Sequence, residues 1–223
     1  MSETSRAAPD AVERELRAPA TDPTAWARAR GTLVDRAGAE NLIDVAVERH
    51  DSPIGRILLG ATAVGLVRVG LPAEEEAAVL EDVARRVSPR ILAAPRATLS
   101  RARHELEEYF EGRRRTFEVD LDWRLTGGFR REVLDATALI PFGRTATYRE
   151  VATRAGRPAA VRAAGTALAT NPLPIVVPCH RVLRTGGGVG SYRGGSEAKV
   201  RLLDLEGVEP EAPSAKRKKR PSP

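Results

Sequence analysis

The one cysteine of this chain, Cys179, stands directly before a histidine, His180. Only the thiolate is a strong nucleophile, and a free thiol with a pKa of about 8.5 is mostly protonated at neutral pH. A neighbouring imidazole can remove that proton and remain beside the sulfur as a counter-cation. We interpret the apolar run at 173–177 as a strand, with Cys179 at its polar exit, whereas a structural cysteine would more naturally lie inside the run. The pair predicts nucleophilic chemistry, the alternative being a chance Cys-His pair on a loop.

The same cysteine count excludes other kinds of site. One cysteine cannot form an intramolecular disulfide, which fits a reducing cytosol, and it cannot build a multi-cysteine zinc site. The three histidines, His50, His104 and His180, are too scattered in the sequence to indicate a metal centre. We therefore expect no metal.

Composition indicates a soluble globular protein. The 223 residues suit one or two domains with a full hydrophobic core. Hydrophobic residues make up 42% and charged residues 30% of the chain, and no apolar run reaches the roughly 18 residues that a membrane span needs. Residues 1–10 lack the basic and apolar regions of a signal peptide. We expect a cytoplasmic protein with no membrane contact.

The net charge of +6 is distributed unevenly. Residues 141–206 contain ten Lys or Arg against four Asp or Glu, and residues 207–223 contain five against two, which leaves residues 1–140 acidic. A basic C-terminal half favours a polyanionic partner. The alternative is a set of solvated surface arginines.

The N-terminal half divides into an extension and an α/β domain. Residues 1–40 show no clean periodicity, and we interpret them as a mobile extension of unknown role with a helical stretch at 11–17. Within residues 41–125, strands are expected at 42–48, 56–59, 64–69 and 117–121, and helices at 73–87 and 98–110. Tyr109 and Phe110 are expected in the core of this domain.

Residues 126–207 predict a mostly helical second domain. Helices are expected at 129–139, 148–154, 159–170 and 196–206. Thr147 and Glu150 have the spacing of a capping box at the start of the second of these. Two short helices joined by a turn at 156–158 form a helix-turn-helix pattern. Residues 208–223, with five basic residues at 216–220, are interpreted as a basic disordered tail.

Four sequence blocks, taken together with their order in the chain, indicate a known family. They are residues 140–152, the Arg162 segment, Pro178-Cys179-His180-Arg181-Val182, and residues 190–195. Together they resemble the O6-alkylguanine-DNA alkyltransferases, strongly over residues 127–207 and more weakly back to about residue 42. The resemblance implies a ribonuclease-H-like α/β N-terminal domain with a small mixed sheet, then a mostly α-helical C-terminal domain with a winged-helix-like helix-turn-helix. It implies a monomer that acts on double-stranded DNA containing O6-alkylguanine, with O4-alkylthymine as a further candidate substrate. No cofactor is needed, because the damaged DNA carries the transferred group.

The resemblance also implies catalytic roles. Cys179 would attack the alkyl carbon, His180 would act as its base through a bridging water, and Glu206 would orient His180 as the third member of a relay. Tyr148 would donate a hydrogen bond to the leaving guanine, which is a poor leaving group unless its developing charge is stabilised. Asn171 would tie the DNA-binding helix to the cysteine segment. Without the resemblance, the alternative for Tyr148 is a core tyrosine at a helix start, and the alternative for Asn171 is a helix C-cap.

The predicted helix at 159–170 is unusual for a major-groove reader. It offers one arginine, Arg162, among small residues that let a backbone approach DNA closely, which suits the narrow minor groove. In the family, an arginine at this position replaces the nucleotide that is flipped out of the duplex. The alternative is a packed core helix with one exposed arginine. The predicted DNA-binding residues are Thr147, Ala160, Arg162, Ala163 and Gly165.

The loop at 189–195 resembles the family's wall of the guanine pocket. Its glycines permit close approach and Tyr192 can pack on the base, although the loop could instead be a mobile connector. Arg193 could pair with a phosphate. Besides Tyr148, the predicted pocket residues are Pro174, Val189, Gly190, Tyr192, Arg193 and Gly194.

The chain departs from the family at two positions of the first helix in the second domain. Arg130 and Leu134 stand where relatives usually have glutamine and tryptophan. These positions bear on DNA affinity more than on the chemistry.

Three other functions compete with alkyl transfer. A protein that binds DNA damage without chemistry would lack the reactive cysteine. A helix-turn-helix redox sensor would need a resolving cysteine, and a hydrolase would need an oxyanion device. We expect irreversible transfer that consumes one protein molecule per lesion, because a thioether is a poor leaving group.

Overall fold

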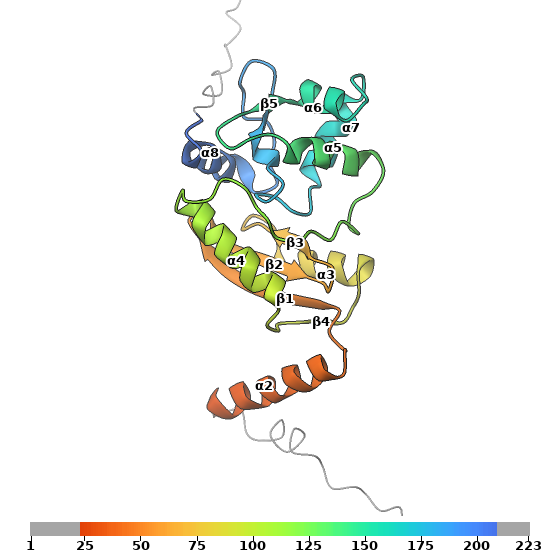
Figure 1. Cartoon of the computed structure of the whole chain (residues 1–223), viewed down its shortest axis with the longest axis vertical. Helices are drawn as coiled ribbons and strands as arrows, with labels where there is room; N and C mark the ends of the chain where they lie inside the picture. Colours follow the sequence, from red (N-terminus) through yellow and green to blue (C-terminus); the bar gives the residue numbers. More distant parts are fainter. Residues whose placement is uncertain (1–22, 209–223) are drawn as a thin grey trace, which may run out of the picture.

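The computed structural model describes residues 23–208, which form a sheet-containing half and a helical half (Figure 1). The predicted helix at 11–17 and almost all of the predicted basic tail at 208–223 lie outside the described residues. The expected fold class, a small mixed sheet domain followed by a mostly helical domain, is confirmed. No described helix combines the length and apolar character that crossing a bilayer requires.

A four-stranded mixed sheet forms the N-terminal half, in the order β3-β2-β1-β4. The strands β1 (Val45–Ser52), β2 (Gly55–Ala61) and β3 (Leu66–Gly70) are antiparallel neighbours, and β4 (Ile91–Leu92) pairs parallel to β1. A tight turn opposes Ser52 to Gly55, and Gly55 adopts a φ of 107°, a conformation that favours glycine. Every residue of β3 is buried, so both faces of the sheet are covered there.

Two helices complete this half. The helix α4 (Ala97–Phe110) packs on β1, β2 and β3 (Figure 1) through Leu99, Ala102, Leu106 and Tyr109, which recur at helical spacing. The shorter α3 (Glu76–Arg86) buries Val79 and Val83 and contacts β3. The core position expected for Tyr109 is confirmed, because its side chain is fully buried.

The strand predicted at 117–121 is wrong. In this segment only an isolated bridge between Leu121 and Leu66 forms. The Glu105 carboxylate, buried on α4, accepts the backbone N–H groups of Glu118 and Val119 at 2.8 and 3.1 Å. These donors are satisfied by a side chain and so do not pair with a neighbouring strand.

The C-terminal half is built from α5 (Phe129–Ala138), α6 (Tyr148–Arg154), α7 (Val161–Ala169) and α8 (Gly195–Leu205). The helices α5, α6 and α7 pack on one another. Two two-residue strands, β5 (Ala146–Thr147) and β6 (Val182–Leu183), pair in parallel and were not predicted. The predicted capping box is confirmed: the Thr147 hydroxyl accepts the N–H of Glu150, whose carboxylate accepts the N–H of Thr147.

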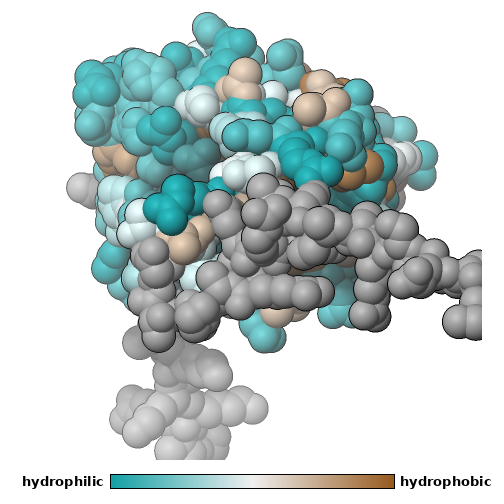
Figure 2. All heavy atoms as spheres, turned by 90° about the horizontal axis from the view of Figure 1, so that it is seen from below, coloured by the Kyte–Doolittle hydropathy of each residue, from teal (hydrophilic) through white to brown (hydrophobic). Residues whose placement is uncertain are grey.

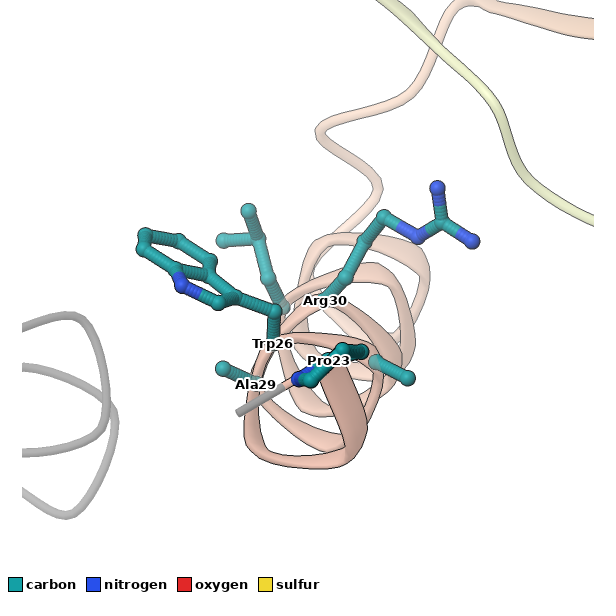
Figure 3. A pocket seen from close by; sticks show the side chains of 6 residues that line it. Pro23, Trp26, Ala29 and Arg30 are labelled. Atoms are coloured by element: carbon teal, nitrogen blue, oxygen red, sulfur yellow. The ribbon is translucent and has the colours of Figure 1, made fainter. Parts of the chain in front are cut away.

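The helix α2 (Pro23–Ala39) lies beyond the sheet, at the end of the molecule opposite to the C-terminal helices (Figure 1). It falls within the residues interpreted as an extension, so part of that segment is helical. Trp26 and Leu33 are exposed on it, and Figure 3 shows the Trp26 ring standing out from the helix. Seen from this end, the coloured surface is mostly hydrophilic, with apolar residues scattered over it (Figure 2).

The two halves share one hydrophobic core. Buried residues of the sheet and α4 form a continuous cluster with buried residues of α5, α6, α7 and α8. The backbone N–H of Val69 on β3 donates to the Pro172 carbonyl at 2.8 Å. Residues just after α7 are therefore fixed directly to the sheet, which positions the segment that carries the cysteine.

Candidate active site and DNA-binding face

The apolar residues before the cysteine form a turn, so the predicted strand at 173–177 is wrong. Pro172, Pro174 and Pro178 lack backbone donors and cannot continue a strand ladder. Ile175 adopts a φ of 74°, and the chain folds back so that Pro174 bridges Val177. Cys179 then begins a short 3-10 helix, η1 (Cys179–Arg181). The thiol is only 5% exposed, so Cys179 does not lie at a polar exit as expected but faces the interior of the domain.

Asn171 holds the thiol in place. Its amide nitrogen lies 3.2 Å from the Cys179 sulfur and also donates to the Val177 carbonyl at 2.9 Å. Its amide oxygen accepts the N–H of Leu173 at 3.0 Å. One buried side chain just after α7 thus joins the turn and the Cys179 thiol, which is the tie that the resemblance implies.

Burial makes the thiol hard to ionise, and nearby groups oppose that effect. Burial raises the pKa of Cys179, whereas the hydrogen bond from Asn171 and the charges of Lys199 and Arg193 lower it. The Lys199 ammonium is buried and donates to the Val182 carbonyl at 2.6 Å. Burial lowers the pKa of Lys199 to about 8. The resting thiol is therefore neutral, with positive charges placed to stabilise a thiolate when it forms.

His180 is fully buried beside Glu206, with its Nε2 atom 2.9 Å from Oε1 of the carboxylate. Its other ring nitrogen, Nδ1, is buried and has no hydrogen-bond partner among the described residues. Burial lowers the pKa of His180, and Glu206 acts in the opposite direction. The ring is therefore neutral at rest, and Nδ1 is the nitrogen left to receive a proton.

Glu206 is the most heavily hydrogen-bonded carboxylate of the site. In addition to His180, it accepts two bonds from the Arg181 guanidinium at 2.8 and 2.9 Å, one from the Tyr109 hydroxyl at 2.7 Å and one from the Gly143 N–H at 3.2 Å. Burial raises the pKa of Glu206, but the hydrogen bonds and charges of His180 and Arg181 outweigh this effect and lower it to about 2. The carboxylate thus stays charged throughout the physiological range.

Two of these partners were missed by sequence reasoning. Nothing in the sequence marks Arg181 as a partner of Glu206, and the helical spacing predicts only a core position for Tyr109. Tyr109 lies 97 residues before Glu206 and on the other half of the molecule, so no local spacing could have revealed the contact.

Tyr148 lies at the start of α6 with its ring between two glycines. A Cβ atom on Gly190 would lie 2.8 Å from the Tyr148 hydroxyl, and one on Gly165 would lie 3.8 Å from its ring. Gly190 also has a φ of 68°, which an L side chain rarely adopts. The loop and α7 therefore both approach this tyrosine closely. Burial raises the pKa of Tyr148, so its hydroxyl stays protonated and can donate a hydrogen bond.

The remaining predicted pocket residues surround the same region. The Tyr192 ring stands edge-on to His180, with centroids 6.5 Å apart, and its buried hydroxyl has no partner among the described residues. Gly194 packs so closely that a Cβ would lie 2.8 Å from the Tyr192 ring. Pro174 is buried near the cysteine turn, and Val189 is half-buried.

Arg193 has partners within the protein. Its guanidinium lies 3.2 Å from the Glu74 carboxylate and donates to the Ala169 carbonyl at 3.2 Å. In this structure the side chain that was expected to reach a phosphate is thus committed to an acid of the N-terminal half and to the end of α7.

One face of α7 is open to solvent. Arg162 and Ala163 are exposed and Ala160 and Gly165 half-buried, whereas the opposite face buries Ala164, Ala167 and Leu168. Arg162 forms no ion pair with any described residue. The Thr147 hydroxyl donates to Glu150 at 2.8 Å and is occupied with capping α6.

Comparison with known proteins identifies the family. Residues 128–208 match the DNA-binding domain of 6-O-methylguanine DNA methyltransferase, and residues 47–123 match the ribonuclease-like domain of the same family. The chain belongs to this family. The alkyltransferase resemblance expected from the cysteine motif is thereby confirmed.

Individual relatives agree with this assignment. The inducible methylated-DNA–protein-cysteine methyltransferase of Bacillus subtilis is 38% identical over 148 residues, which cover 66% of this chain and 82% of the relative. The crystal structure of Mycobacterium tuberculosis O6-methylguanine methyltransferase is 34% identical, with a TM-score of 0.63 over 75% of this chain and 96% of the other. The crystal structure of Mycobacterium tuberculosis OGT in complex with DNA gives a TM-score of 0.62 at 34% identity, over 72% of this chain and 92% of the other.

A hollow along α2 lies apart from the predicted site. A hollow of about 520 Å³ along α2 is lined by residues such as Trp26 and Arg30 (Figure 3), none of which belongs to the predicted site. Within residues 23–208, no group of three or more His, Cys, Asp or Glu side chains is arranged to hold a metal ion.

Proposed function

We propose that this family member repairs O6-alkylguanine in double-stranded DNA by transferring the alkyl group to Cys179. Membership in the family assigns the chain to DNA repair by alkyl transfer to a protein cysteine. The observation that carries the proposal at residue level is the buried thiol of the chain's one cysteine, held by Asn171 beside the His180–Glu206 pair.

The chemistry is an in-line displacement at the alkyl carbon. The thiol proton leaves to Nδ1 of His180, through a bridging water because no direct hydrogen bond joins the two groups, and the sulfur–carbon bond forms as the carbon–O6 bond breaks. The charge that develops on guanine is stabilised by a hydrogen bond from the Tyr148 hydroxyl, and the departing guanine takes its proton from water. The protonated imidazole is stabilised by the Glu206 carboxylate, which itself remains ionised.

Delivery of the base depends on α7. An alkylated guanine inside a duplex is out of reach of a buried thiol, so the nucleotide must be flipped out, which costs a few kcal/mol and least for a poorly paired base. The open face of α7, with small residues around Arg162, fits the minor groove and leaves one long cationic side chain to fill the vacated position in the base stack.

The reaction consumes the protein. The product is a thioether, whose sulfur is a poor leaving group, so each molecule repairs one lesion. All the proposed site residues come from one chain, and we propose that a monomer is the active unit, working wherever the genomic DNA is.

Two variants test this function. Cys179→Ala should bind lesion-containing duplex as tightly as the unaltered protein and transfer nothing, and any residual transfer would refute the assignment. Arg162→Ala should slow transfer from duplex DNA far more than transfer from O6-benzylguanine supplied as the free base. Equal losses on the two substrates would remove Arg162 from nucleotide flipping. Arg157→Ala, an exposed arginine just before α7 that stacks on Phe129, is the matched control.

A further inference from the structure

The loop that connects β6 to α8 forms one side of the proposed pocket, and few of its side chains make polar contacts with the rest of the protein. Residues 184–194 lie between these elements without regular structure, and Gly186, Gly187 and Gly190 all adopt positive φ angles. Tyr192 is half-buried on this loop, and its buried hydroxyl has no hydrogen-bond partner in the described part of the chain. Within residues 185–194, all of which the structure describes, Arg193 is the residue whose side chain hydrogen-bonds or ion-pairs with the rest of the protein.

The partner of Arg193 is itself rigidly placed. Glu74 follows β3, and its carboxylate accepts the Leu71 N–H at 2.9 Å and pairs with the Arg68 guanidinium. Within this pair the Arg68 side chain is 4% exposed and the Glu74 side chain 15%, so water reaches the pair only from the Glu74 side. Burial strengthens the interaction of such charges, because water screens it less. Glu74 thus presents a fixed anion to the loop.

The same cluster contacts the segment that holds the nucleophile. The Arg68 guanidinium donates to the Pro172 carbonyl at 3.3 Å, next to Asn171. Arg193 also donates to the Ala169 carbonyl at the end of α7. The cluster of Arg68, Glu74 and Arg193 therefore joins the sheet, the pocket loop and the end of the DNA-binding helix.

From these contacts we propose that Glu74 is a positioning residue for alkyl transfer, which holds the pocket loop closed through Arg193. The proposal rests on the proposed function, and it gives the N-terminal half a direct part in the reaction. Removing this tie leaves Tyr192 and Gly190 on a glycine-rich loop that is held by packing and has lost its side-chain polar contact with the rest of the protein. A displaced wall misplaces the guanine relative to the thiol, and a misplacement of about 1 Å can slow a reaction by about 100-fold.

The test compares Arg193→Gln, Glu74→Gln and their double variant in single-turnover transfer from duplex DNA containing one O6-methylguanine. Transfer is followed by intact mass over a range of DNA concentrations. We expect each single variant to lower the limiting rate by about tenfold or more, with the half-saturating DNA concentration changed by less than about threefold. The double variant should be no slower than the slower of the two single variants, because each single change already removes the same Arg193–Glu74 ion pair.

Glu76→Gln is the matched control. This acid lies two residues from Glu74 and pairs with Arg49 on the surface, away from the loop. It should transfer at the unaltered rate. Arg193→Gln also keeps the Arg68–Glu74 pair, so it remains informative if Glu74→Gln does not fold.

A pH profile separates positioning from a direct electrostatic effect on the thiol. If Arg193 acted only as a charge near Cys179, raising the pH would restore the rate of Arg193→Gln, and Arg193→Lys would match the unaltered protein. Positioning predicts a deficit that persists at every pH from 6 to 9. Rates within twofold of the unaltered protein, multiplicative losses in the double variant, or rescue at high pH would each overturn the proposal. Absence of transfer by the unaltered protein would instead refute the proposed function.

Discussion

At the residue scale, the site is a balance between burial and hydrogen bonding. The thiol and the imidazole are both buried and neutral at rest, whereas Glu206 is buried and charged because His180 and Arg181 hydrogen-bond to it. The sequence motif could name Cys179 and His180, because they are adjacent. It could not reveal Tyr109 or Glu74, because their contacts with the site depend on how two distant segments pack.

Acid stability should report on Glu206. Its pKa is about 2 in the folded protein, against an ordinary value of 4.5. A lowered carboxyl pKa stabilises the fold above pH 4.5, and this contribution, about 3 kcal/mol, is lost as the pH falls toward 2. Glu206→Gln should unfold more easily at pH 7 by about 3–5 kcal/mol, because the buried Arg181 loses its anion.

The same variant should lose less further stability between pH 4.5 and 2. Urea unfolding at a series of pH values measures both effects. Glu197→Gln, at an exposed position of α8, is the control and should be nearly neutral. A Glu206→Gln variant with unaltered stability at pH 7 would contradict the geometry of this carboxylate.

Tyr109→Phe should shift the pH dependence of transfer. The change removes one hydrogen bond to Glu206, so the carboxylate attracts the His180 proton more strongly and the pKa of His180 rises. More of the imidazole is then protonated on the acid side, and the rate should fall below pH 7 and recover above it. Single-turnover rates from pH 5.5 to 8.5 provide the measurement. If the rates below pH 7 match those of the unaltered protein, the Tyr109 hydroxyl does not influence the pKa of His180.

At the element scale, periodicity predicted the helices well and the short strands poorly. The helices α4, α5, α6, α7 and α8 begin and end within about two residues of their predicted bounds, because buried residues at 3.6 spacing mark them. The strands β4, β5 and β6 are two residues long, too short to show alternation. The predicted strands at 117–121 and 173–177 failed for two reasons: Glu105 takes the backbone donors of the first, and prolines interrupt the second.

The capping box of α6 gives a prediction at this scale. Thr147→Ala removes the hydroxyl that accepts the Glu150 N–H, and loss of such a cap costs about 1 kcal/mol. The thermal midpoint should fall by about 2–4 °C for a chain of this size. Thr153→Ala on the same helix, where the exposed hydroxyl donates to the Arg149 carbonyl, should change it much less. Equal shifts in the two variants would mean that the capping box contributes nothing specific.

At the scale of the whole molecule, the two halves differ in charge and contribute different parts of the proposed site. The acidic N-terminal half supplies the sheet, α4 and the acid Glu74, and the basic half carries the cysteine and the open face of α7. Composition was enough to predict a polyanionic partner. It could not show that the two halves share one core and that the sheet is hydrogen-bonded to the residue next to Asn171.

Salt dependence should report on the basic half. Arg149 and Arg154 are exposed on α6 and form no ion pair with any described residue. If they contact phosphates, changing either to Gln should weaken binding to any duplex and reduce the slope of log affinity against log salt by about one. Arg56→Gln, an exposed arginine on the sheet, is the control. Unchanged slopes for both variants would place the DNA on another face.

The most direct measurement of the central claim is the mass of the protein after mixing with duplex DNA that contains one O6-methylguanine. The account predicts one added methyl group per chain, located on the peptide that carries Cys179, with no further addition at excess DNA. An unmodified Cys179 in a protein that binds the lesion tightly, or a methyl group on another residue, would contradict it.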